Sequence, residues 1–80
     1  MKNEYLKTLW ALRFEKIKKL EEDAACKHED ILEDCLAAFG EHDVAVKLLH
    51  TLVHEERQHA KLADELMRIC RQTHPEIGLF

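Results

Sequence analysis

Glu56 and His59 are the residues of this chain whose types and spacing point most directly to chemistry. They form a Glu-x-x-His step, and on a helix two side chains three residues apart project from the same face. The step stands in an otherwise apolar stripe, where hydrophobic residues are expected. At heptad spacing this stripe reads Ala45, Leu49, Leu52, Glu56, His59, Ala63, Leu66 and Cys70. A buried carboxylate needs a partner, and a metal ion is one.

A second polar break, formed by Glu21 and His28, interrupts the apolar stripe of the preceding segment. That stripe reads Phe14, Ile17, Glu21, Ala24, His28, Ile31, Cys35 and Ala38. A turn near Gly40 folds the chain back, so that these two side chains lie level with Glu56 and His59. A two-fold axis between two chains would double the set of Glu21, Glu56 and His59 to four Glu and two His. Such a mixed oxygen and nitrogen set suits Fe or Mn better than thiol-preferring metals.

The periodicity predicts an all-α chain with one domain, residues 1–80. We expect a helix at about 3–39, a loop at about 40–43, a helix at about 44–73 and a tail at 74–80. Asn3 and Asp43 are the expected N-caps, and Gly40 is the expected stop of the first helix. The short loop makes the helices an antiparallel hairpin. A hairpin alone does not cover both apolar stripes, so two copies should pair into a four-helix bundle.

Composition excludes several classes of function. A net charge of −4 and a pI near 5.8 argue against a nucleic-acid partner. No segment resembles a signal peptide or a membrane span, so we expect a cytoplasmic protein without a membrane partner. Cys26, Cys35 and Cys70 show no C-x-x-C spacing and predict no disulfide framework.

The motif resembles that of a known family. Glu21 followed by the string E-E-R-Q-H-A at residues 55–60 is similar to half of a ferritin-like di-iron protein, of the rubrerythrin and encapsulated-ferritin kind. The resemblance implies that a second chain completes a ferritin-like bundle. It also implies a terminal carboxylate at Glu21, a bridging carboxylate at Glu56 and an imidazole ligand at His59. The implied activity is that of a ferroxidase, the oxidation of Fe(II) with oxygen or peroxide in iron handling or oxidative-stress defence.

Two neighbouring residues keep more than one role open. His28 stands about where relatives often place a Tyr, and it is an extra ligand, a hydrogen-bond donor to a ligand, or a core histidine. Glu55 lies at the edge of its stripe, where it reaches a metal or forms a salt bridge to solvent-exposed groups. The tail at 75–80 faintly resembles tails that load cargo into encapsulin shells; docking on its own bundle is the simpler alternative.

The preferred prediction is therefore a homo-oligomer, a dimer or ring of dimers, with a di-iron cofactor for which Mn or Zn are substitutes. One alternative is a metal-free helical oligomerisation module, in which the same Glu and His side chains form a buried polar layer. Another is a non-catalytic metal-binding protein, for example one that holds zinc. The remaining histidines are expected to be surface residues: His42, His50, His54 and His74.

Overall fold

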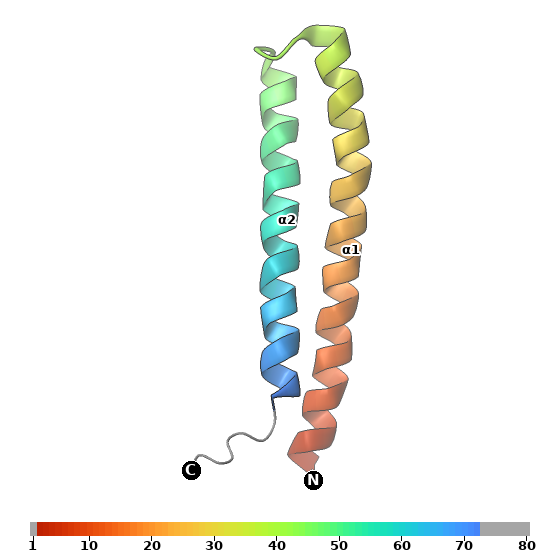
Figure 1. Cartoon of the computed structure of the whole chain (residues 1–80), viewed down its shortest axis with the longest axis vertical. Helices are drawn as coiled ribbons and strands as arrows, with labels where there is room; N and C mark the ends of the chain where they lie inside the picture. Colours follow the sequence, from red (N-terminus) through yellow and green to blue (C-terminus); the bar gives the residue numbers. More distant parts are fainter. Residues whose placement is uncertain (1, 73–80) are drawn as a thin grey trace.

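The chain forms an antiparallel hairpin of two long helices (Figure 1). The computed structural model describes residues 2–72; Met1 and residues 73–80, which include His74 and the predicted tail, lie outside the described part. Helix α1 spans Lys2–Phe39 and helix α2 spans Val44–Arg71. The described residues contain no strand. The chain is thus all-helical, with its two helices packed against each other.

Two residues build the turn between the helices. Gly40 has a φ of 90°, in the left-handed region that favours glycine, and its N–H donates to the carbonyl of Leu36 at 2.9 Å. The Asp43 carboxylate accepts from the N–H of Ala45 at 2.8 Å and caps α2. Helix α1 starts at Lys2, so the predicted cap Asn3 is a helical residue instead.

The seam between the helices is made of small side chains. Its buried hydrophobic residues are Ala11, Ala25, Val46, Val53, Ala60, Ala63 and Met67. Many large apolar side chains remain exposed; Trp10 is 46% and Ile31 is 52% exposed. Small residues let the two backbones approach closely, but they bury little apolar area. Most of the chain's hydrophobic surface is therefore left without a partner inside the hairpin.

Many of the exposed apolar side chains of both helices lie on the same face. Leu52 comes one residue before the buried Val53, and Leu66 one before the buried Met67. Successive residues are rotated by about 100° around the helix axis. In an antiparallel pair, the residues that come one position before the buried seam residues therefore lie on the same face in both helices. We call this the open face; its stripes are Trp10, Ile17, Ala24 and Ile31 on α1 and Ala45, Leu52, His59 and Leu66 on α2.

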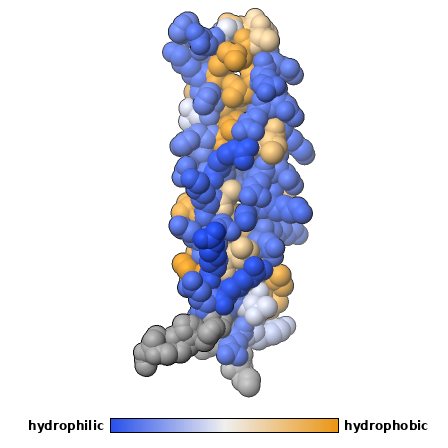
Figure 2. Space-filling model, viewed as in Figure 1, coloured by the Kyte–Doolittle hydropathy of each residue, from blue (hydrophilic) through white to orange (hydrophobic). Residues whose placement is uncertain are grey.

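The stripes on the opposite side of the seam are mainly polar. They are Leu12, Lys19, Cys26 and Glu33 on α1 and Lys47, His54, Lys61 and Arg68 on α2. Figure 2 shows one broad face of the hairpin, on which hydrophilic side chains cover both helices and hydrophobic ones are confined to the seam and the margins. The two faces therefore differ in polarity, and the open face is the one suited to burial.

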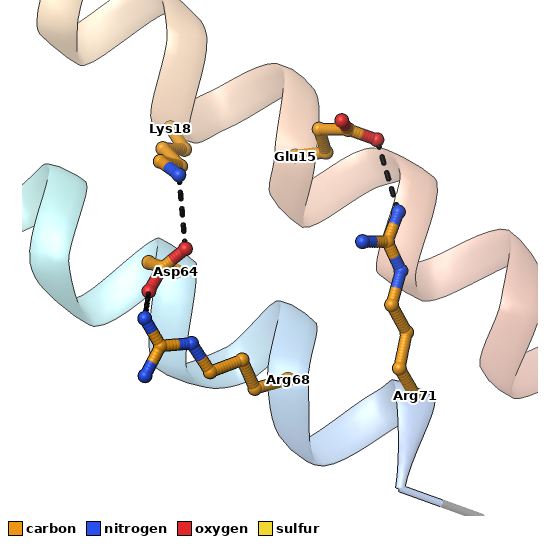
Figure 3. Close-up of polar contacts among 5 residues, drawn as sticks. All are labelled: Glu15, Lys18, Asp64, Arg68 and Arg71. Atoms are coloured by element: carbon orange, nitrogen blue, oxygen red, sulfur yellow. Dashed lines mark hydrogen bonds and ion pairs between the residues drawn. The ribbon is translucent and has the colours of Figure 1, made fainter.

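Ion pairs tie the two helices together toward the N-terminal end of α1 (Figure 3). Lys18 donates to Asp64 at 2.9 Å, and Arg71 donates to Glu15 at 3.2 Å. Arg68, on the same helix as Asp64, pairs with that carboxylate at 2.6 Å. The hydrogen bond from Lys18, and then the charge of Arg68, hold the pKa of Asp64 below its ordinary value of 3.8.

The hairpin is one layer thick. Its principal extents are 56 × 20 × 12 Å, and the shortest matches the diameter of one helix with side chains, about 10–12 Å. The radius of gyration is 17.9 Å, against about 12 Å for a compact domain of this length. Neither described helix is long and apolar enough to cross a membrane. Within residues 2–72, no second layer covers the open face.

Candidate metal centre

Glu56 and His28 form the most buried polar contact between the helices. The Nδ1 atom of His28 lies 2.9 Å from Oε1 and 2.8 Å from Oε2 of Glu56. The Glu56 side chain is 11% exposed and that of His28 is 32% exposed. Among the residues that the structure describes, Glu56 is the one buried charged side chain. Its burial is offset by this hydrogen bond from the other helix.

The contact determines which nitrogen of His28 carries a proton. An ionised carboxylate only accepts hydrogen bonds, so Nδ1 of His28 is the donor. In the neutral imidazole Nε2 then keeps its lone pair and remains able to accept a hydrogen bond or bind a metal. A carboxylate that receives such a bond is also fixed in orientation, which is how partners of metal ligands commonly act.

Glu21 and His59 form the second contact of this kind, and it is looser. Oε2 of Glu21 lies 3.6 Å from Nδ1 of His59, which is too long for a hydrogen bond. The Glu21 side chain is 28% exposed and that of His59 is 59% exposed. Because His59 belongs to the open-face stripe, this pair lies at the surface that one chain leaves uncovered.

The two pairs lie near each other along the hairpin. Glu56 and His59 are three residues apart on α2, a rise of about 4.5 Å. Glu21 and His28 are two turns apart on α1, so each reaches a different partner. One chain therefore presents two separate carboxylate–imidazole pairs, one buried and one exposed.

The predicted ligands do not all meet within one chain. Among residues 2–72, no group of three or more His, Cys, Asp or Glu side chains is arranged to hold a metal ion. Within one hairpin both oxygens of Glu56 face His28, and Glu21 lies 3.6 Å from His59. A position shared by Glu21, Glu56 and His59 stays a prediction, and it would need side-chain movement or a second copy of the chain.

Glu55 takes no part in these contacts. It is exposed and comes one residue before Glu56, so the helix turns it about 100° away from that residue, toward the open face. Three roles were expected for His28. The contact that the structure shows is its hydrogen bond to Glu56.

The sequence positions of His28 and Glu56 relative to the turn are consistent with their contact, independently of the heptad pattern. The two residues are 28 positions apart, and the middle of that interval falls in the turn between Gly40 and Asp43. In an antiparallel hairpin, residues equally distant from the turn lie opposite each other. Counting outward from the turn places them at the same level, and the packing of the seam decides which side chains touch.

The chain was also compared with known proteins. No family model matches it, and no curated protein or solved structure is significantly similar to it. A functional assignment therefore depends on the residues of this chain.

Proposed function

We propose that this chain is a ferritin-like di-iron protein that oxidises Fe(II) with oxygen or peroxide at a site shared between two copies. The observation that carries the proposal is the buried Glu56 carboxylate, held by His28 and adjacent to the Glu21–His59 pair at the open face. Each copy contributes Glu21, Glu56 and His59. Oxygen and nitrogen donors without thiolate suit iron.

The open face supports pairing with a second copy. Large apolar side chains lie exposed along both helices, and a single layer leaves nothing to cover them. The Glu21–His59 pair lies at the same face, so the packing that buries the hydrophobic stripes would also bring the pairs of two copies together. A second hairpin adds three further donors, which gives four carboxylates and two imidazoles for two metal ions.

The residues of this chain have distinct tasks in the proposed site. Glu21, Glu56 and His59 of each copy would hold the metal ions, the first two through carboxylate oxygens and the third through an imidazole nitrogen. His28 holds the Glu56 carboxylate through Nδ1 and fixes its orientation. Bound iron supplies the redox chemistry, and the protein supplies ligand geometry and exclusion of bulk water.

The proposal extends to the environment and the assembly. Cys26, Cys35 and Cys70 are free, and free thiols persist in a reducing compartment such as the cytoplasm. The minimum assembly is a dimer, and rings of dimers are compatible with the same site. Mn or Zn would occupy the same donors in place of iron.

Native mass spectrometry after anaerobic loading with Fe(II) tests the proposal. We expect an even-numbered oligomer with close to one iron per chain, and loss of iron in Glu56→Ala. Glu65→Ala is the matched control, because it removes an exposed carboxylate from the same helix. Oxygen consumption on adding air would then establish turnover. A folded oligomer that takes up no iron would overturn the di-iron assignment.

One observation favours a second candidate, a metal-free oligomerisation module. The Nδ1 atom of His28 already lies within hydrogen-bond distance of both oxygens of Glu56 without a metal, so the polar pairs can serve as a buried layer that sets the register of packing. This candidate predicts that the oligomer is indifferent to chelators. A zinc-binding protein without turnover would instead bind metal at the same residues and consume no oxygen.

A further inference from the structure

His50 and His54 form a pair of exposed histidines away from the central site. Both belong to α2 and are one helical turn apart. Both line one groove of about 240 Å³. Within residues 2–72, neither imidazole takes part in a hydrogen bond or an ion pair, so no existing contact must be broken for a ligand to bind. The groove is lined by Glu29, Leu32, His50, Val53, His54 and Arg57.

The spacing of the two histidines is that of a chelating pair. Side chains four apart on a helix have their Cβ atoms about 5–6 Å from each other. The two histidines of the H-E-x-x-H zinc motif have the same separation and bind one ion from one helix face. Here the intervening residues are Thr51, Leu52 and Val53, and Val53 is buried against α1, which fixes this part of the helix.

The groove lies on the side of the seam opposite the open face. His54 comes one residue after the buried Val53, whereas the open-face residue Leu52 comes one before it. A second copy packed on the open face would therefore leave His50 and His54 accessible. His50 and His54 are therefore distinct from the central carboxylates, and ligand binding to them does not require two chains to pair.

Glu29 is the third donor that the groove offers. It comes from α1 and is held by Arg57 at 2.8 and 3.2 Å. The two side chains are 45% and 43% exposed, and ion pairs at such positions contribute little to stability. As they stand, the three side chains are not arranged around one ion, since no group of three such donors among residues 2–72 is. Glu29 must therefore release Arg57 and turn toward a cation bound at the histidines. A cation held by all three residues would link α1 to α2.

We propose that His50 and His54, with Glu29 as third ligand, form a second metal site for a borderline divalent cation, with Zn²⁺ as the preferred ion. Imidazole ligands suit Zn²⁺, Cu²⁺ and Ni²⁺, and water completes the coordination. The site does not depend on the proposed di-iron centre, since it shares no residue with it.

The test is a Zn²⁺ titration of the full chain, followed by the imidazole resonances of its histidines in NMR spectra. We expect His50 and His54 to shift together with the first equivalent of Zn²⁺. Glu29→Ala should weaken binding, and His50→Ala should weaken it by roughly 100-fold, because linking two ligands gives avidity gains of that order. Circular dichroism checks that each variant keeps its helices.

A relocated histidine provides the matched control. Lys47→His combined with His50→Ala keeps six histidines but places the pair seven residues apart, too far along the helix to bind one ion. Equal Zn²⁺ affinity of this variant and the wild type would overturn the proposal. First-equivalent shifts at His28 and His59 instead would also overturn it, and would leave the di-iron proposal standing.

Discussion

At the scale of single residues, Glu56 brings a negative charge into the seam between the helices. A carboxylate removed from water without a partner is costly. His28 supplies that partner at 2.8 Å, while the neighbouring Glu55 stays exposed. Hydrogen bonds to charged groups contribute about 1.5–3 kcal/mol, which is close to the cost of burying such a group. The pair therefore adds little net stability to the hairpin.

Replacing both members of the pair tests this balance. Glu56→Leu with His28→Leu should keep the free energy of unfolding or raise it by up to about 2 kcal/mol, as apolar substitutes of buried ion pairs often do. His28→Leu alone should lower it by about 1–3 kcal/mol, because the Glu56 carboxylate is left unpaired. Urea denaturation measures both changes. A double variant less stable than the single variant would show that the pair itself stabilises the hairpin.

At the scale of elements, the reversal of the chain depends on a few residues between α1 and α2. Gly40 adopts a left-handed conformation, and Asp43 caps the first turn of α2. Since the loop is short, these two positions determine where the helices start to pair. The ion pairs of Asp64 then hold the opposite end of the seam.

Gly40→Ala should lower the free energy of unfolding by about 1–2 kcal/mol, the cost of placing an L-residue in the left-handed region. A Cβ at this position meets no atom within 4 Å, so the backbone conformation alone accounts for the loss. Chemical denaturation measures it, with the exposed Glu41→Ala as the control. An unchanged stability would mean that the turn relaxes to another conformation without cost.

The ion pairs of Asp64 predict a dependence of stability on pH. The pKa of Asp64 is lowered in the folded chain, by the hydrogen bond from Lys18 and then by the charge of Arg68. The contribution of Asp64 to the free energy of unfolding is thus complete at a pH above its ordinary pKa of 3.8. It is lost as the pH falls through the lower pKa of the folded chain. Asp64→Asn should have a lower melting temperature than the wild type at pH 6. This difference should shrink as the pH falls below 3.8. Thermal unfolding at pH 6, 4 and 3 measures the difference; a constant gap would contradict the linkage.

At the scale of the whole molecule, a layer one helix thick leaves an apolar face without cover. The inner seam uses alanine and valine, while leucine, isoleucine and tryptophan side chains stay exposed. A small chain buries only a modest core by itself, and pairing would add the missing burial. The looser Glu21–His59 pair lies at that same face, so assembly and metal binding should depend on each other.

A charge introduced on the open face should therefore disrupt both properties. Leu52→Glu is expected to shift the oligomer to monomers and to reduce iron uptake, because a carboxylate at a dry interface has no partner. Leu12→Glu is the matched control, since Leu12 is also an exposed leucine but lies on the other side of the seam. Light scattering and iron analysis of both variants measure the effects. Equal effects of the two substitutions would contradict pairing through the open face.

The sequence by itself determined the helical class, the turn and the apolar stripes. These follow from local rules: Gly40 tolerates a positive φ, Asp43 caps a helix, and the period of 3.6 residues places Leu52, Glu56 and His59 near one face. These local rules predicted the ends of the helices less exactly. Helix α1 includes Asn3, because one capping residue close to a terminus does not oblige the helix to start there.

Only the tertiary structure decided which polar residues meet. Heptad phase brings Glu21, His28, Glu56 and His59 to one region, but the packed seam sets the axial register, and that register pairs His28 with Glu56 and leaves Glu21 at 3.6 Å from His59. A shift of one helical turn moves a side chain by about 5.4 Å, more than the length of a hydrogen bond. Periodicity in one helix does not specify the register between two, because register depends on how the small residues Ala25, Val53 and Ala60 fit together.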